Sequence, residues 1–101
     1  MNKLALVTGG SRGLGKDMAL ALAAKGLDVI LTYQTNAEDA AEVVREIEAS
    51  GKLAAALPLN LLEIKALDGF VASLEQLLAD RFEGRKLDFL VNNAGMGATI
   101  P

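Results

Sequence analysis

A short apolar run passes directly into a glycine-rich loop in the stretch Leu4-Ala5-Leu6-Val7-Thr8-Gly9-Gly10-Ser11-Arg12-Gly13-Leu14-Gly15. An unbroken apolar run of this length is typical of a buried parallel strand, and the alanine-rich pattern after the glycines is typical of a helix. The stretch therefore predicts a strand that turns through a glycine loop into a helix. Unpartnered backbone N–H groups and the helix dipole make the start of such a helix a candidate site for an anion such as phosphate.

Two kinds of phosphate loop compete for this stretch. A P-loop fits the seven positions from Gly10 to Lys16, but its eighth position is Asp17, where a magnesium-binding Ser or Thr is required. The other pattern, Thr8-Gly9-x-x-x-Gly13-x-Gly15, resembles the cofactor loop of short-chain dehydrogenases/reductases, a dinucleotide loop with respaced glycines. We favour the dinucleotide loop. For the loop taken alone, a glycine turn that only makes a tight connection stays open as a third interpretation.

Composition narrows the class of protein. The chain has 101 residues, no Cys, no His and a formal net charge of −3. It therefore has no disulfide or thiolate metal site and lacks the commonest metal ligand, so we expect no metal. The negative charge argues against nucleic acid as a partner. No apolar run approaches the ~20 residues of a membrane span, and no signal-peptide pattern is present, so we expect a cytoplasmic protein without a membrane partner.

Strand and helix patterns alternate along the chain. We expect strands at residues 4–7, 27–32, 52–59 and 87–91, and helices at residues 13–25, 37–49 and 61–82. The first helix has at helical spacing Leu14, Met18, Ala21, Leu22 and Lys25, and its alanines at positions 19, 21, 23 and 24 are expected to allow close approach to a sheet. The third has an apolar pattern of Ile64, Leu67, Phe70, Val71, Leu74, Leu77 and Leu78. Asn36 is the expected N-cap of the second helix.

This alternation with short connections requires a parallel sheet with right-handed crossovers. The predicted fold is a three-layer, doubly wound α/β sheet of Rossmann type with strand order 3-2-1-4, in one domain over residues 1–101. Ligands of such sheets bind at the carboxyl ends of the strands. Polar or glycine-rich segments stand at those ends, at residues 9–15, 33–36, 60–61 and 92–95.

Three segments together carry a family resemblance: the glycine loop, Leu59-Asn60-Leu61 after the third strand, and Asn92-Asn93-Ala94-Gly95 after the fourth. With them the chain resembles the short-chain dehydrogenases/reductases over all 101 residues, most of all the 3-oxoacyl-carrier-protein reductases and their relatives. The resemblance implies an NAD(P)-dependent oxidoreductase that transfers hydride between nicotinamide and a carbonyl or alcohol substrate. It also implies a homo-oligomer, either a dimer or a tetramer.

The resemblance implies a set of cofactor-binding residues. Those that hold the pyrophosphate and the adenosine ribose are Gly9, Ser11, Arg12, Gly13, Leu14 and Gly15. Those that meet the adenine are Asn60 and Leu61, and those that line the cofactor cleft are Asn93, Ala94 and Gly95. Asn92 is expected instead to tie the fourth strand to its neighbour.

The end of the second strand predicts which dinucleotide is preferred. Enzymes that select NAD place an acid about twenty residues past the loop, where it accepts hydrogen bonds from the ribose and repels a 2′-phosphate. Here Tyr33, Gln34 and Thr35 provide no acid. We therefore expect NADP(H) to be preferred, with the Arg12 guanidinium on the 2′-phosphate and further donors from Gln34 and Thr35, and NAD(H) as the alternative.

The family's catalytic residues are not found in this sequence. They are a Tyr-x-x-x-Lys pair, a Ser and an Asn that follow the Asn-Asn-Ala-Gly segment, whereas the only tyrosine here, Tyr33, has Ala37 four residues later. No catalytic residue is therefore assigned. We expect the cofactor-binding part of an enzyme whose C-terminal half is absent, with an exposed sheet edge beside apolar surface. The alternative is a nucleotide-binding or interaction module without catalysis.

Overall fold

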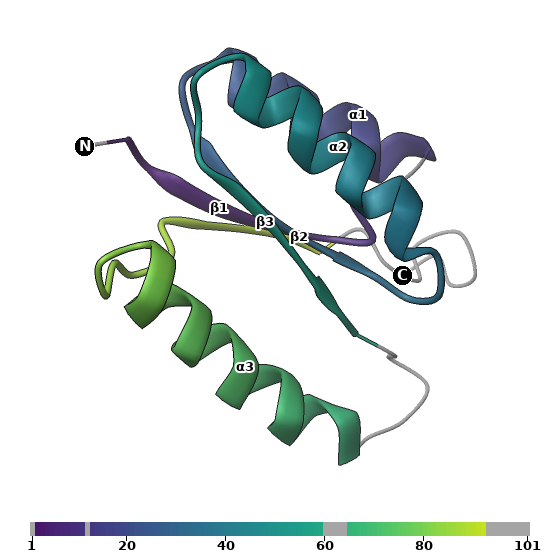
Figure 1. Cartoon of the computed structure of the whole chain (residues 1–101), viewed down its shortest axis with the longest axis vertical. Coiled ribbons are helices and arrows are strands. Elements are labelled where there is room, and N and C mark those ends of the chain that lie inside the picture. Colours follow the sequence, from purple (N-terminus) through teal and green to yellow (C-terminus); the bar gives the residue numbers. More distant parts are fainter. Residues whose placement is uncertain (1, 12, 60–64, 93–101) are drawn as a thin grey trace.

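The computed structural model describes residues 2–11, 13–59 and 65–92, in which strands and helices alternate (Figure 1). The elements are β1 (Leu4–Thr8), α1 (Gly13–Ala24), β2 (Asp28–Tyr33), α2 (Ala37–Ala49), β3 (Ala54–Pro58), α3 (Lys65–Arg81) and β4 (Phe89–Asn92). The strands form one parallel sheet in the order β3-β2-β1-β4. The predicted strand order and Rossmann-type architecture are therefore confirmed.

The sheet lies between two layers of helices. Figure 1 shows α1 and α2 on one face and α3 on the other. The core under α1 and α2 includes Val7, Val29 and Leu31, and the core under α3 includes Leu4 and Ile30. Because both faces of β1 are covered, all five of its residues are buried. This burial explains why β1 is an unbroken apolar run rather than an alternating one.

The buried face of α1 agrees only in part with the prediction. The helix buries Gly15, Ala19 and Ala23, whereas Leu14 is 64% exposed and Ala21 faces solvent. Residues four apart lie on one side of a helix, so these three small residues form a row that lets α1 lie close to the sheet. The expected close approach of the helix alanines to the sheet is confirmed for Ala19 and Ala23, whereas the expected apolar pattern is wrong for Leu14 and Ala21.

The other elements agree with the sequence apart from their ends. Asn36 is the N-cap of α2, because its Oδ1 accepts the Asp39 N–H at 3.1 Å. β2 continues through Tyr33 and β4 through Asn92, while β3 is shorter than predicted. The predicted start of the third helix, at residues 61–64, lies outside the described residues.

Apolar surface lies on β4 and α3. β4 is at one end of the sheet, and within the described part of the chain it pairs with β1 alone. Phe89 is 45% exposed and Leu90 63%, and on α3 both Leu67 and Val71 are also exposed. The predicted exposed edge beside apolar surface is confirmed for this part. Among the described helices, none combines the length and the apolar character that a membrane span requires.

Candidate cofactor site

The glycine loop leaves β1 at the carboxyl edge of the sheet and enters α1 at Gly13. The φ angles of Gly9 and Gly13 are 69° and 60°, in the left-handed region that strains any residue with a Cβ. Gly10 is required for space instead, because a Cβ there would lie 2.8 Å from the Cβ of Leu31. Glycine is therefore required for its backbone conformation at Gly9 and Gly13, and for close packing at Gly10.

The loop is attached to the end of β2 through Thr32. The Gly9 N–H donates to the Thr32 hydroxyl at 2.9 Å, and the Gly10 N–H donates to the Thr32 carbonyl oxygen at 3.0 Å. Thr32 itself is only 2% exposed. The first turn of the loop is thus held at the place where β2 ends.

The start of α1 suits a phosphate group. The first turn of the helix, which lies wholly within the described residues, carries no acidic side chain. A Cβ built on Gly13 would meet no atom of the described residues within 4 Å, so the space beside its Cα is open. The helix N-terminus adds backbone donors and a partial positive charge. These residues fit the pyrophosphate of a dinucleotide.

The segment after β2 lies next to the loop. Tyr33 is the last residue of the strand and is half-buried, while Gln34 and Thr35 are exposed. The nearest acids in sequence, Glu38 and Asp39, are in the first turn of α2. The Tyr33 carbonyl oxygen also accepts the Leu59 N–H at 2.8 Å, which brings the end of β3 to the same edge.

Asn92 joins β4 to β1 at this edge. The Thr8 hydroxyl donates to Asn92 Oδ1 at 3.0 Å and also lies 3.4 Å from the Val91 carbonyl oxygen. This contact confirms the expectation that Asn92 ties the fourth strand to its neighbour. The ends of β1, β2 and β4 are therefore held by side-chain hydroxyl groups as well as by the strand ladder.

The structure brings together those predicted site residues that it describes. Gathered at the carboxyl edge are Gly9, Ser11, Gly13, Leu14, Gly15, Tyr33, Gln34 and Thr35. Outside the described residues lie Arg12, Asn60, Leu61, Asn93, Ala94 and Gly95. Sequence reasoning missed Thr32 as part of this site. Its only signal was a polar side chain that ends an otherwise apolar run.

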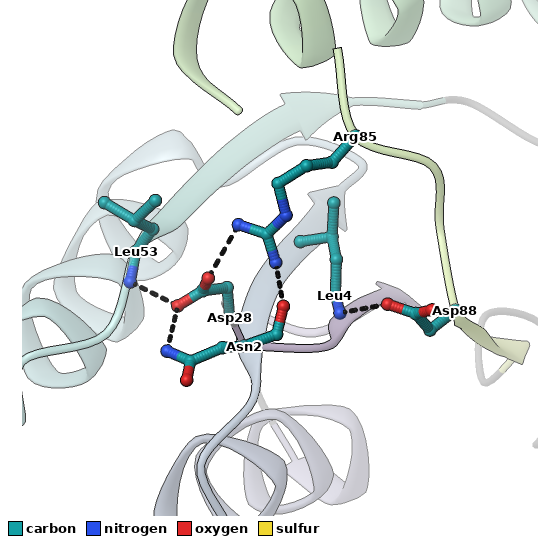
Figure 2. A network of polar contacts seen from close by, with 6 residues as sticks. All are labelled: Asn2, Leu4, Asp28, Leu53, Arg85 and Asp88. Carbon is teal, nitrogen blue, oxygen red and sulfur yellow. Dashed lines mark hydrogen bonds and ion pairs between the residues drawn. The ribbon is translucent and has the colours of Figure 1, made fainter. Parts of the chain in front are cut away.

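A second polar cluster lies at the opposite, amino edge of the sheet (Figure 2). Asp28, the first residue of β2, is 2% exposed. Its Oδ2 accepts from Arg85 Nη1 at 2.8 Å, and its Oδ1 accepts the Leu53 N–H at 2.8 Å and Asn2 Nδ2 at 3.2 Å. Arg85 also donates to the Asn2 carbonyl oxygen, and Asp88 Oδ2 accepts the Leu4 N–H at 2.8 Å.

The electrostatics of this cluster favour a structural role. Burial raises the pKa of Asp28, but the hydrogen bonds from Leu53, Arg85 and Asn2 and the charge of Arg85 outweigh it, so the pKa lies below its ordinary value. The bonded groups belong to the starts of β1 and β2 and to the residues just before β3 and β4. The cluster therefore joins the beginnings of the four strands, far along the sheet from the glycine loop. In the described residues no three potential metal-ligating side chains of the His, Cys, Asp or Glu type gather into a site.

The family model and several similar known proteins point to the same family. The model of the short chain dehydrogenase family matches residues 3–101. The 3-oxoacyl-[acyl-carrier-protein] reductase of a Synechocystis species is 42% identical over 94 residues, which are 93% of this chain and 36% of that protein. The trihydroxynaphthalene reductase of Colletotrichum orbiculare is 35% identical over 96 residues, 95% of this chain and 32% of that protein. The chain thus spans about a third of the length of these curated relatives.

Solved structures show the same likeness. A short chain dehydrogenase from Burkholderia cenocepacia, determined in complex with NADP, has a TM-score of 0.78 and 44% identity, with 92% of this chain and 36% of that chain covered. The family model covers nearly every residue, and the fold is similar to that of this solved relative. The chain therefore belongs to the short-chain dehydrogenase family.

Proposed function

We propose that this chain forms the NADP(H)-binding part of an oxidoreductase that transfers hydride between nicotinamide and a carbonyl or alcohol substrate, in a homo-oligomer. The observation that carries the proposal is the geometry of the glycine loop. Gly13 is the first residue of α1, its φ angle is in the left-handed region, and the space beside its Cα is open. The loop is hydrogen-bonded to the carboxyl end of β2, which has no acidic side chain. Phosphate groups are bound by such a helix start through backbone donors.

The preference for NADP(H) rests on the segment after β2. An acid at this place would repel a 2′-phosphate, and Tyr33, Gln34 and Thr35 provide none. The Gln34 and Thr35 side chains are exposed beside the loop and carry hydrogen-bond donors. Arg12 supplies the positive charge, because a guanidinium binds phosphate through two hydrogen bonds. The NADP-bound relative from Burkholderia cenocepacia supports the same choice.

The proposed site divides into parts with separate tasks. Residues for the pyrophosphate and ribose are Gly9, Ser11, Arg12, Gly13, Leu14 and Gly15; for the 2′-phosphate end they are Tyr33, Gln34 and Thr35. Residues for the adenine are Asn60 and Leu61, and for the cleft they are Asn93, Ala94 and Gly95. The dinucleotide, when bound, would donate or accept the hydride, and these residues would bind and orient it. The proton donor for the substrate is proposed to lie outside these 101 residues.

Replacing Arg12 with Ala tests the cofactor assignment. In the full-length polypeptide that carries this chain, we expect Arg12→Ala to weaken NADPH binding by roughly 10- to 100-fold, because a hydrogen bond to a charged group is worth about 1.5–3 kcal/mol. NADH, which lacks the 2′-phosphate, should lose much less. Isothermal calorimetry with each dinucleotide measures both dissociation constants. Arg45→Ala, on the exposed side of α2, is the matched control for the loss of one positive charge.

Two results would contradict the assignment. Equal weakening of NADPH and NADH would show that Arg12 does not read the 2′-phosphate. A protein that binds neither dinucleotide before mutation would contradict the proposed function itself.

A further inference from the structure

Thr32 holds two consecutive residues of the glycine loop with its two oxygen atoms. The hydroxyl oxygen accepts the Gly9 N–H at 2.9 Å and the carbonyl oxygen accepts the Gly10 N–H at 3.0 Å. The hydrogen bond to the carbonyl oxygen would survive any substitution at residue 32, since that oxygen belongs to the backbone. The hydroxyl bond depends on the side chain. The three residues before Thr32 in β2 are Val29, Ile30 and Leu31, whose apolar side chains could not accept such a bond.

The place of this bond matters for the shape of the loop. Gly9 is the residue at which the chain leaves β1 with a φ of 69°. At Gly10 the loop passes so close to Leu31 that a Cβ would not fit. A shift of the first turn would therefore be carried forward to Gly13 and to the start of α1, where the pyrophosphate is proposed to bind.

Thr32 also precedes the segment proposed to bind the 2′-phosphate of the cofactor. Tyr33, Gln34 and Thr35 follow it directly in sequence. Thr32 is 2% exposed, so its side chain acts through Gly9 rather than by contact with a ligand. We propose that Thr32 is a positioning residue whose hydroxyl holds the glycine loop in the geometry that binds the dinucleotide pyrophosphate. This inference rests on the proposed function.

The test compares ligands with and without a pyrophosphate. Thr32→Val keeps the shape of the side chain and removes the acceptor, while Thr32→Ser keeps the hydroxyl. The probes are NADPH, NADH and adenine, which has no phosphate or ribose and is proposed to meet Asn60 and Leu61 rather than the glycine loop. Dissociation constants are measured on the full-length polypeptide that carries this chain, with the fraction folded checked by circular dichroism.

We expect Thr32→Val to weaken both NADPH and NADH, each by roughly 3- to 10-fold, the equivalent of one lost hydrogen bond. Adenine should keep its affinity, and Thr32→Ser should bind all three probes as the unmodified protein does. Ser50→Ala is the matched control: it removes a hydroxyl that bonds to Ile47 at the end of α2, far from the loop in the chain. It should change no dissociation constant.

A purely structural role predicts a different pattern. It would lower the melting temperature of Thr32→Val without changing the dinucleotide affinity of the folded fraction, or would weaken all three probes alike. Either result, or a failure of Thr32→Ser to restore binding, would overturn the proposal. If Thr32→Val does not fold, Thr32→Cys replaces the hydroxyl with a weak acceptor and the same comparison is made. If the unmodified protein binds neither dinucleotide, the proposed function fails instead.

Discussion

Asp28 shows how one buried carboxylate can hold several strands. It accepts hydrogen bonds from Arg85, from the Leu53 N–H and from Asn2 (Figure 2). Asn at this position would keep one acceptor oxygen but would turn an amide donor toward one of these donors, and it would leave the Arg85 charge without its partner. We expect Asp28→Asn to lower the free energy of unfolding by about 3 kcal/mol, at the low end of the range for a broken buried ion pair. Urea denaturation at pH 7 measures this loss.

The same substitution has a defined pH dependence. Folding lowers the pKa of Asp28. The ionised carboxylate therefore stabilises the fold fully at a pH above the pKa of the unfolded state, about 3.9, and this stabilisation is lost as the pH falls through the lower pKa of the folded state. The gap in stability between the unmodified protein and Asp28→Asn should therefore shrink below pH ~4. Glu46→Gln, on the exposed side of α2, is the control for one lost negative charge. A gap that stays constant at lower pH would contradict the assignment.

Single residues were predictable where a local rule, as for a helix cap, or the family resemblance points to them. Asn36 was predicted as a cap, and Asn92 as a tie to the neighbouring strand, and both were confirmed. The Asp28–Arg85 pair was not predicted, because its members are 57 residues apart and only the folded sheet brings them together. An Asp and an Arg in a sequence are usually surface charges, so neither residue type signalled burial.

At the scale of elements, α1 is positioned by small side chains. Gly15, Ala19 and Ala23 face the sheet. We expect Ala19→Leu to force α1 away from the sheet and to lower the free energy of unfolding by about 1–3 kcal/mol, the usual cost of overpacking. Because α1 carries the proposed phosphate site, dinucleotide affinity should fall with it. Urea denaturation and calorimetry measure the two effects.

Ala21→Leu separates the observed face of α1 from the predicted one. Ala21 was expected on the apolar stripe with Leu14, but in the structure it faces solvent. The substitution adds the same volume as Ala19→Leu and keeps a good helix former, so stability should change by less than about 0.5 kcal/mol. Equal losses in the two variants would show that the small-residue row is not the packed face.

The type and order of the elements could be predicted because their periodicities are strong. The alternation of apolar strands with helical patterns gave the order of the seven elements, and their ends shifted by a few residues. The burial of individual helix positions was harder to predict. Leu67 and Val71 fit the apolar pattern of α3 but are exposed, since periodicity identifies an apolar stripe without showing what covers it.

For the whole molecule, the topology followed from physical rules about connections. Short links between parallel strands require right-handed crossovers, which leave few arrangements for four strands. The carboxyl edge was therefore predictable as the ligand side, and the described site residues do gather there. The hydrogen bond from the Gly9 N–H to the Thr32 hydroxyl could not be predicted in this way, because it depends on the rotamer of one side chain and on how the loop lies against β2.

Hydride transfer to a carbonyl also needs a proton donor at the carbonyl oxygen, and this requirement gives a prediction for residues 1–101 expressed alone. The family's Tyr-x-x-x-Lys pair is missing from the sequence, and Tyr33 is half-buried at the end of β2 in the proposed cofactor site. We expect no NADPH oxidation above background with a panel of ketones and acetoacetyl thioesters. Absorbance at the reduced nicotinamide band follows the reaction, while calorimetry separately reports whether NADPH binds. Turnover by a homogeneous preparation whose measured mass matches these 101 residues would show that the proton donor lies within them. The proposal that the proton donor lies outside these residues would then be wrong.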